Sequence, residues 1–322
     1  MALSEFDLIT HFFKRNQDQP RAIELGIGDD AAVVNVPSGQ SLVMSLDTLV
    51  AGVHFPIDVP PDAIAHKALA VNLSDMAAMG AQPAWMLLGL TLPGADDAWL
   101  AAFSNELHCL ADKYGVTVIG GDTTRGPLTI TIQINGTLPQ GQALKRRGAQ
   151  AGDLIYVTGQ LGDAGLGLKL VENNLELDIS SQRRDYFIQR LHRPTPRVKA
   201  GIALRGIASS AIDISDGLMA DLGHLVEASG VAATVNIEAL PVANEISALR
   251  EQWWMLPLTA GDDYELCFTV ATDKQLMVEK KLREIDCPYS CIGRIEAGIG
   301  VNVKYAGETI KISSAKGYQH FD

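Results

Sequence analysis

Apolar and polar residues follow two different periods along this chain, and their order predicts alternating strands and helices. The two-residue period of a strand is clearest in LTITIQINGTL, where Leu and Ile alternate with Thr, Gln and Asn. Helical segments keep apolar residues three or four positions apart, as in the segment that follows Pro61. In the first half we predict strands at 31–36, 41–50, 85–92, 116–121 and 128–138, and helices at 61–79 and 96–114.

The second half repeats this mixture after a polar, basic and glycine-containing segment, PQGQALKRRGAQAG. We place the junction at 140–149, which divides the chain into domains 1–139 and 150–322. Strands are predicted at 153–159, 233–238, 264–270, 290–297 and 301–312, and helices near 182–205, 217–229 and 273–285. The fold class is therefore α+β, with two sandwich-type domains, a mixed or antiparallel N-terminal sheet and helices packed on one face.

Length and charge narrow the function classes. The 322 residues suit two domains of ordinary size. With 38 Asp plus Glu against 26 Lys plus Arg, the formal charge is −12, which argues against nucleic acid as a partner. An acidic chain of this kind is compatible with binding divalent cations.

Cysteines and apolar runs give further exclusions. The four cysteines have no second Cys or His pair at zinc-site spacing, so we expect reduced thiols. The N-terminal segment lacks the basic start and uninterrupted apolar run of a signal peptide. No apolar run reaches the length of a membrane span, so we expect a cytoplasmic protein without a membrane partner.

Aspartates recur where apolar strands or helices begin and end. Each one alone could be a turn or cap residue, and Asp216 could simply be the N-cap of the helix after it. The set is harder to explain in that way, because charged residues are almost never buried unless they are paired. Arg125 is the only Lys or Arg in the short segments directly around these aspartates. The aspartates concerned are Asp29, Asp30, Asp47, Asp75, Asp122, Asp213, Asp216, Asp262 and Asp263.

Bound divalent metal would remove the conflict between these like charges. Several ionised carboxylates in one cleft would cost several kcal/mol each or force protonation. Mg²⁺ prefers oxygen ligands, takes one or two carboxylates per ion and bridges substrate phosphates. We therefore predict a site with several Mg²⁺ ions that binds a polyphosphate. Calcium is an alternative, although no EF-hand spacing is present.

The familiar nucleotide-binding signatures are missing. The chain has no GxxxxGK[ST] loop, no GxGxxG after its first strand and no HRD or DFG kinase motif. The glycine-rich segment 158–170 has the wrong spacing for a dinucleotide fingerprint and is typical of a tight strand-to-helix turn. A nucleotide would then be held through metal ions and scattered arginines.

Eight motifs together resemble the thiamine-monophosphate kinase family, which is similar in fold to aminoimidazole ribonucleotide synthetase and selenophosphate synthetase. They lie in order between residue 21 and residue 321 and read GIGDDAAV, SLDTLVAGVHF, KALAVNLSDMAAMGA, GGDTTRGP, KRRGAQAGD, IDISDGL, GDDYELCF and GYQHF. The resemblance implies ATP-dependent phosphorylation of thiamine monophosphate to thiamine diphosphate. It also implies a homodimer in which first-domain sheets meet, with ATP bound between the domains.

The resemblance also implies roles for individual residues. Implied ligands of Mg²⁺ are Asp30, Ser45, the Leu46 carbonyl, Asp47, Asp75, Asp122, Asp213 and Asp216. Implied ATP contacts are Gly121, Asp122, Arg146 and Ser215. Implied contacts of the thiamine phosphate are His54, Asp263 and Tyr318. The residues expected to carry catalysis are Asp47, Asp75, Asp122 and Arg146.

Three positions depart from the family pattern. Many members have Thr where Leu46 stands, so only its backbone oxygen can serve. The family often has Glu-Asp where this chain has Asp262-Asp263. A Trp is often found near the C-terminus, where the aromatic candidate here is Tyr318.

The chemistry implied is direct in-line transfer, because the acceptor phosphate is already ionised and scarcely needs a base. Metal ions and Arg146 would neutralise the repulsion between the two anions. Two alternatives stay open: another ATP-dependent synthetase of this fold group, and a noncatalytic nucleotide or metal sensor. Two of these residues also have alternative roles. His54, which lies among apolar residues, could be a structural residue, and Arg146, which lies in the polar junction, could simply be solvated.

Overall fold

The computed structural model describes residues 5–15, 22–172, 174–249, 253–310 and 312. The chain divides into two compact units. Unit 1 contains Met1–Met76 and Ala81–Gly141, and unit 2 contains Ala77–Gly80 and Gln142–Asp322. None of the described helices is both long and apolar enough to cross a bilayer.

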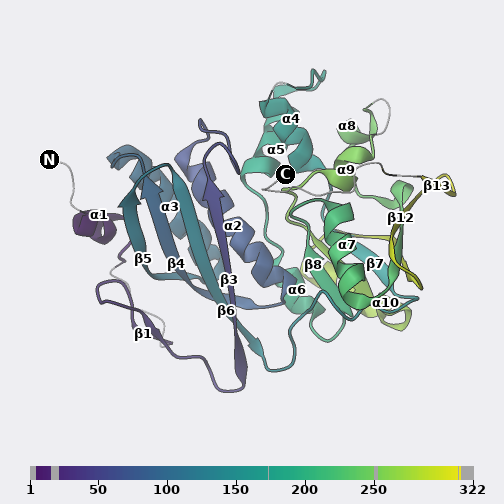
Figure 1. Ribbon diagram of the computed structural model, residues 1–322, viewed down its shortest axis with the longest axis horizontal. Helices are drawn as coiled ribbons and strands as arrows, with labels where there is room; N and C mark the ends of the chain where they lie inside the picture. The colour runs from purple at the N-terminus through teal and green to yellow at the C-terminus, as the bar shows by residue number, and fades with distance from the viewer. Residues whose placement is uncertain (1–4, 16–21, 173, 250–252, 311, 313–322) are drawn as a thin grey trace. The chain divides into compact units, whose positions relative to one another are not determined.

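Unit 1 is built on a four-stranded mixed sheet (Figure 1). Its strands, in sheet order, are β3 (Gln40–Val50), β6 (Thr129–Pro139), β4 (Gln82–Leu92) and β5 (Thr117–Arg125). β6 pairs antiparallel with both of its neighbours, whereas β4 and β5 run parallel. A separate ribbon pairs β1 (Ile23–Leu25) with β2 (Val33–Val34).

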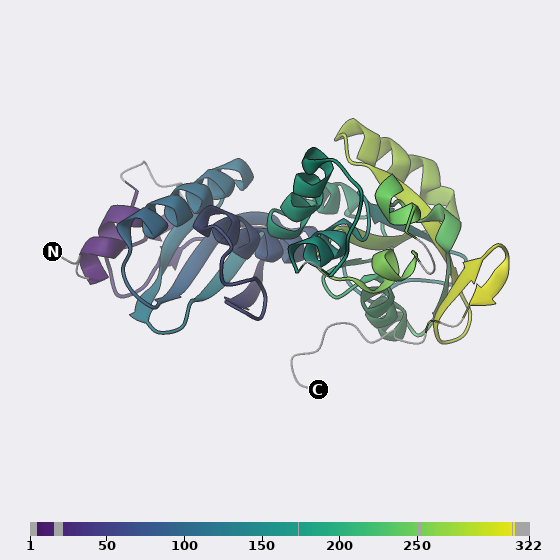
Figure 2. The same cartoon turned by 90° about the horizontal axis from the view of Figure 1, so that it is seen from above.

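Helices α2 (Pro61–Ala78) and α3 (Asp97–Tyr114) lie on the same side of this sheet, behind the strands in Figure 1, and Figure 2 shows the same arrangement from above. The third helix of unit 1 is α1 (Glu5–Phe12). Asp96 begins α3 by accepting the N–H groups of Ala98 and Trp99, and Gly115 ends it in the left-handed conformation.

The other face of the sheet carries large apolar side chains in contact with solvent. Along β3 the side chains of Leu42, Met44 and Leu46 are 41%, 62% and 58% exposed. The residues between them are half-buried, as the two-residue period of a strand requires. Helices α2 and α3 therefore cover one side of the sheet. On the other side, called the uncovered face below, Ile23 of the β1–β2 ribbon packs against Trp85 and Ile119, while the β3 part is exposed.

Unit 2 contains a seven-stranded sheet in the order β13-β12-β9-β11-β7-β10-β8. The strands are β7 (Leu154–Thr158), β8 (Ser210–Asp213), β9 (Ala232–Asn236), β10 (Leu266–Val270), β11 (Tyr289–Glu296), β12 (Gly300–Tyr305) and β13 (Glu308–Ile310). Only the β12–β9 pair is parallel among the described strands of this sheet. The α-helices of unit 2 are α4 (Asp163–Val171), α5 (Ser181–His192), α6 (Val198–Leu204), α7 (Leu218–Ser229), α8 (Asn244–Ser247), α9 (Met255–Thr259) and α10 (Gln275–Glu284), and the 3₁₀ turns are η1 (Ile237–Ala239) and η2 (Thr272–Lys274).

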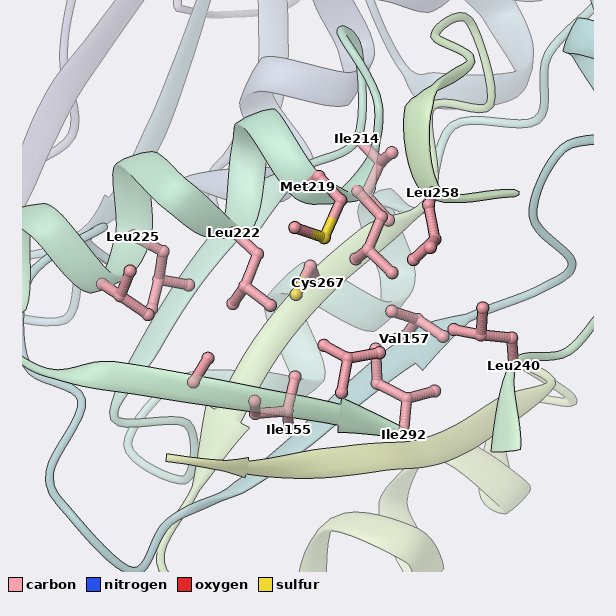
Figure 3. Packing of buried hydrophobic residues seen from close by; sticks show 14 of the residues in the cluster. Ile155, Val157, Ile214, Met219, Leu222, Leu225, Leu240, Leu258, Cys267 and Ile292 are labelled. Atoms are coloured by element: carbon pink, nitrogen blue, oxygen red, sulfur yellow. The ribbon is translucent and has the colours of Figure 1, made fainter. Parts of the chain in front are cut away.

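The core of unit 2 forms where α7 packs on this sheet (Figure 3). Met219, Leu222 and Leu225 of α7 point toward Cys267 of β10 and Ile155 of β7. All five side chains are buried. The same cluster includes Ile214 and Leu258, which precede two turns of the candidate site described below. Burial of apolar surface stabilises the fold by roughly 25 cal/mol per Å², so this cluster fixes the positions at which both turns begin.

The predicted α+β class is confirmed, with local corrections. The expected helix at 182–205 is wrong as one element, because Pro194 and Pro196 cannot continue a helix and the chain breaks into α5 and α6. The expected strand at 31–36 is reduced to the two residues of β2. The expected strand at 301–312 is a hairpin, since Ala306 and Gly307 both have positive φ between β12 and β13.

Candidate active site

Unit 1 has a cavity of about 1020 Å³ over the uncovered face of its sheet. The motif Gly26–Ala32 lines one part of it, and Gly121 and Asp122 line another. Leu46 of β3 also contributes, so four of the predicted residues share this cavity: Asp30, Leu46, Gly121 and Asp122. A hollow that combines apolar walls with a few acidic groups is typical of a ligand site.

Two adjacent aspartates at this cavity, Asp29 and Asp30, are linked by a hydrogen bond within their turn. The Asp30 backbone N–H donates to Asp29 Oδ1 at 2.9 Å, and both residues are exposed. Lys14 lies beside the same turn, because a Cβ on Gly28 would be 3.1 Å from its Nζ. Lys14 also lines the cavity, which adds a cation that the sequence analysis did not select.

Gly121 allows β5 to approach β4 closely. Its φ is +149°, and an added Cβ would lie 1.9 Å from the Leu88 carbonyl oxygen. Asp122 follows directly, is exposed, and pairs with Gly89 in the parallel ladder. The glycine thus fixes the backbone from which the predicted metal-binding and ATP-binding Asp122 projects.

The other two predicted aspartates of unit 1, Asp47 and Asp75, lie on the side of the sheet that α2 covers. Ser45 on β3 donates its hydroxyl to Asp75 Oδ2 on α2. Asp47 is two residues further along the same strand and is half-buried like Ser45, so it shares that face. The structure therefore brings Ser45 and Asp75 into contact, while Leu46 points to the opposite face.

His54 follows β3 in a short turn. The Val50 N–H donates to His54 Nδ1 at 3.0 Å, which places the proton of the neutral ring on Nε2. Lys67 of α2 is 3% exposed and donates to the His54 carbonyl at 3.3 Å. These two bonds fix the backbone and the ring of His54, so that its Nε2–H can donate to a ligand from a fixed position.

In unit 2 the turn between β8 and α7 is organised by a carboxylate that the sequence analysis did not select. Asp221 Oδ2 accepts the backbone N–H groups of Ser215, Asp216 and Gly217 at 3.0, 3.0 and 3.2 Å. Asp213 is buried at the end of β8, and Ser215 and Asp216 are half-buried in the turn. Burial raises the pKa of Asp221 to about 7, and the nearby Asp213 and Asp216 add to this effect.

A second turn, residues 259–264, is bonded to the first. The Asp262 N–H donates to the Ser215 carbonyl and the Tyr264 N–H to the Ile214 carbonyl, both at 2.9 Å. Asp262 and Tyr264 have φ values of +68° and +50°, conformations that cost energy in residues other than glycine. Gly261 permits the contact, since a Cβ there would be 2.3 Å from the Ser215 oxygen.

Asp263 lies at the centre of this second turn and is fully buried. Its carboxylate accepts the N–H groups of Gly162 at 2.6 Å and Ala164 at 3.2 Å, which caps the start of α4. Burial raises the pKa of Asp263 to about 8, despite those bonds and the nearby Arg190. In this geometry the carboxylate of Asp263 holds the fold, and the half-buried member of the pair is Asp262.

A buried ionic group supports the same turn. Glu265 is 0% exposed and forms a two-pronged pair with Arg197, with N–O distances of 2.5 and 2.6 Å. Arg190 donates to the same carboxylate at 3.1 Å, and Thr158 donates to it at 2.7 Å. These four bonds hold Glu265 in place directly before β10, and removal of either arginine would leave its buried charge less well compensated.

Arg146 is separated from Ser215 within unit 2. Its carbonyl accepts the Ser229 hydroxyl at 3.2 Å, and Ser229 is the last residue of α7. Ser215 lies before the start of this 12-residue helix, which is about 18 Å long at 1.5 Å per residue. The exposed Arg146 side chain therefore starts from the far end of α7.

The donor set fits Mg²⁺ in its chemistry. Across the described residues, no three or more His, Cys, Asp or Glu side chains gather into a metal-binding cluster. Mg²⁺ does not require one, because it takes one or two carboxylates and completes its shell with waters and phosphates. Oxygens in small groups of this kind are present at Asp29–Asp30, at Ser45–Asp75 and in the Asp213–Asp216 turn. Asn72 Oδ1, three residues before Asp75, is a buried acceptor with no hydrogen-bond partner in the described structure.

The placements leave some predictions untested. Tyr318 lies outside the described residues. Within unit 1 the cavity joins Asp30, Leu46, Gly121 and Asp122, and within unit 2 the two bonded turns join Asp213, Ser215, Asp216 and Asp263. Lys14 and Asp221 were missed. Asp221 had one usable signal, a carboxylate in the first turn of the helix after IDISDG, whereas Lys14 had none because its contact depends on the fold.

Known proteins resemble this chain over its full length. The family models described as AIR synthase related protein, N-terminal domain and C-terminal domain, match residues 28–138 and 150–306. A thiamine-monophosphate kinase of Salmonella typhimurium is 48% identical over 324 residues, covering 100% of this chain and 99% of that protein.

Two solved structures agree with these matches. The crystal structure of thiamine-monophosphate kinase from Stenotrophomonas maltophilia K279a has a TM-score of 0.82 and 45% identity, covering 90% of this chain and 93% of that one. A structure of AaThiL complexed with AMPPCP and TMP has a TM-score of 0.76 and 32% identity, covering 92% of each chain. At 45% and 32% identity, both structures are similar to this chain in sequence as well as in fold.

Proposed function

This chain belongs to the thiamine-monophosphate kinase family, and from that membership we propose that it transfers the γ-phosphoryl group of ATP to thiamine monophosphate, giving thiamine diphosphate and ADP. The family resemblance predicted from the motifs is thereby confirmed. The observation that carries the reaction is the related complex with AMPPCP and TMP, whose chain this one matches over 92% of its length. AMPPCP is an ATP analogue that cannot donate its γ-phosphoryl group, so that pair stands for the two substrates.

The transfer proceeds in line and without a covalent intermediate. The acceptor is a phosphate monoester that is ionised at neutral pH, so its oxygen needs little help from a base. The main obstacle is repulsion between two anions, which falls when positive charge lies between them. The protein therefore contributes chiefly by holding both substrates at fixed positions.

We assign magnesium binding to oxygens of both units: Asp30, Ser45, the Leu46 carbonyl, Asp47, Asp75, Asp122, Asp213 and Asp216. When bound, Mg²⁺ neutralises phosphate charge and orients the transferred group. The Ser45–Asp75 hydrogen bond supports this assignment, because it fixes a carboxylate on the face that Asp47 shares. The Asp221 bonds do the same for the turn that bears Asp216.

We assign ATP contacts to Gly121, Asp122, Arg146 and Ser215. Gly121 supports this because its missing side chain lets β5 approach Leu88 of β4 closely, which fixes the backbone that carries Asp122 at the cavity. Arg146 and Ser215 originate from opposite ends of α7, so they contact different parts of the nucleotide. Asp122 and Arg146, together with Asp47 and Asp75, remain the proposed catalytic residues.

Thiamine phosphate is assigned to His54, to Tyr318 and to the turn that Asp263 holds. The bond from Val50 to His54 Nδ1 supports the first, since it leaves the Nε2 proton as the donor. Asp263 is buried and bonded to the start of α4, so its contribution is to hold the turn from which Asp262 reaches a ligand. Asp262 is the shorter counterpart of the Glu found in many family members.

The protein acts as a homodimer in this proposal, with the uncovered sheet face of unit 1 as its interface. Leu42, Met44 and Leu46 supply an apolar surface there, and such surfaces are typical of association sites. A cytoplasmic location remains a prediction.

The test is acceptor choice. Purified protein with ATP and MgCl₂ is offered thiamine monophosphate, thiamine or no acceptor, and products are separated by chromatography. We expect thiamine diphosphate and ADP in equal amounts from the first mixture only. Nucleotide binding without product would favour a sensor, and ATP consumption that ignores thiamine monophosphate would favour another synthetase of the fold group.

A further inference from the structure

The turn that carries Ser215 and Asp216 is folded around one carboxylate. Asp221 Oδ2 accepts three consecutive backbone N–H groups, those of Ser215, Asp216 and Gly217, at 3.0–3.2 Å. Asp221 itself lies in the first turn of α7 and is 3% exposed. A carboxylate with three N–H donors in a buried place is a strong, charge-assisted anchor.

This anchor holds the residues that lead into α7. Gly217 is the N-cap of α7, with φ +113° and no side-chain capping bond. Asp221 reaches back from the first turn of α7 to the N–H of this N-cap residue and of the two residues before it, as the acidic member of a capping box reaches back to its N-cap. The same three N–H groups would otherwise form a concave anion site of the kind that binds phosphate. Because Asp221 occupies them, this turn can offer a nucleotide its side-chain oxygens and not its backbone donors.

The opposite side of the turn is fixed as well. The Ser215 carbonyl accepts the Asp262 N–H, and the neighbouring Ile214 carbonyl accepts the Tyr264 N–H. Figure 3 shows Ile214 and Leu258 pointing into the core of unit 2 just before the two turns. Loss of the Asp221 bonds would therefore release one side of an otherwise fixed turn, and Ser215 and Asp216 would lose their orientation.

We propose that Asp221 is a positioning residue that orients Asp213, Ser215 and Asp216 toward a Mg²⁺-bound nucleoside triphosphate. The inference rests on the proposed function, because it assigns those three residues to metal and ATP. Asp221 does not touch the ligand. Partners that orient metal ligands in this way are worth about 10- to 100-fold in affinity or activity when removed.

The test measures binding and turnover in Asp221→Ala and Asp221→Asn. Calorimetric titration with Mg·AMPPCP is expected to show a dissociation constant raised about 10- to 100-fold in Asp221→Ala. Asp221→Asn keeps one acceptor oxygen and is expected to fall between Asp221→Ala and the unchanged protein. KM for ATP is expected to rise by a similar factor. KM for thiamine monophosphate should stay within about 2-fold, because the 259–264 turn keeps its own anchor in the bonds of Asp263 to Gly162 and Ala164.

A matched control separates positioning from general loss of stability. Asp96 also accepts two backbone N–H groups at a helix start, but it lies in unit 1 at α3 and has no proposed ligand nearby. Asp96→Ala is expected to lower the melting temperature and leave both KM values unchanged. Equal rises of both KM values in Asp221→Ala, or unchanged Mg·AMPPCP binding, would overturn the proposal.

Hydrogen exchange keeps the idea testable if Asp221→Ala does not fold. In the unchanged protein without nucleotide, the amides of Ser215, Asp216 and Gly217 are expected to be protected. Exchange at the rate of an unstructured peptide would overturn the inference. If the protein binds Mg·AMPPCP but makes no thiamine diphosphate, the proposed reaction fails while the binding comparison still decides the role of Asp221.

Discussion

Aspartates in similar sequence contexts have different structural roles in this protein. Asp221 and Asp263 are buried and accept backbone N–H groups, whereas Asp30 and Asp122 are exposed at a cavity. The sequence could place acidic residues at turns because glycines and apolar strands surround them. It could not tell which would be buried, since Asp263 bonds to Gly162, about a hundred residues away in the chain. Burial is a property of the packed fold.

Asp47→Asn should separate catalysis from folding. The change keeps the shape of the side chain and removes one charge, so we expect turnover to fall by about 100-fold or more, equivalent to roughly 2.7 kcal/mol. The melting temperature without metal should stay the same or rise, because repulsion among carboxylates decreases. Steady-state rates and thermal unfolding measure both. Asp97→Asn, at the first turn of α3, is the control and should keep its rate. Full activity in Asp47→Asn would refute its ligand role.

Asp263 should make stability depend on pH. Its pKa rises from 3.8 to about 8 on folding, mainly through burial, so the native state holds a proton there that the unfolded chain releases. The contribution to stability is present below pH 3.8 and is lost as pH rises toward 8. In that window the loss approaches about 1.4 kcal/mol per pH unit.

Urea unfolding at several pH values, compared with Asp263→Asn, isolates this effect. Asparagine does not titrate, so the stability of the unchanged protein relative to the variant should decline from pH 5 to pH 8. Other groups titrate equally in both proteins and cancel in the difference. Parallel curves would show that Asp263 is ionised in the native state.

Elements with a clear period could be predicted, while those set by distant contacts could not. Strand β6 follows the two-residue period, β4 is a nearly continuous apolar run, and α3 begins and ends at a recognisable Asp and Gly. The order β3-β6-β4-β5 does not follow from the sequence, since any of several pairings would bury the same apolar face. The break between α5 and α6 was available from its two prolines and was overlooked.

Gly121→Ala tests the close approach of β5 to β4. Its Cβ would lie 1.9 Å from the Leu88 oxygen, so the strands must separate and we expect a loss of about 3 kcal/mol in unfolding free energy. Gly39→Ala is the matched control, with φ +77° and nothing within 4 Å of its Cβ, and should lose only about 1 kcal/mol. Denaturant titration distinguishes them. Equal losses would mean that the backbone angle alone, and not the contact, requires glycine.

For the molecule as a whole, the family and the fold class could be predicted from the sequence, because eight motifs span nearly the full chain. The match to family models at 28–138 and 150–306 follows the same extent. The uncovered sheet face of unit 1 was not deducible in detail, because apolar residues such as Met44 look equally suited to a buried core. Only the fold shows which apolar side chains face solvent.

Met44→Asp tests whether that face is a dimer interface. Met44 is 62% exposed, so a charge there costs little in the isolated chain but should disrupt an apolar interface. Light scattering should give twice the 34.5 kDa chain mass for the unchanged protein and the single mass for Met44→Asp. Ile299→Asp, at 91% exposure in unit 2, should not change the mass. A monomer before any substitution would contradict the proposed interface.

Magnesium uptake is the decisive measurement, because the proposal assigns Mg²⁺ to Asp30, Asp47, Asp75, Asp122, Asp213 and Asp216. Metal-free protein is titrated calorimetrically with MgCl₂ at saturating AMPPCP, with a blank titration of AMPPCP alone. We expect more than one Mg²⁺ per chain, and weaker uptake in Asp47→Asn. Heat no greater than the nucleotide blank would contradict the account.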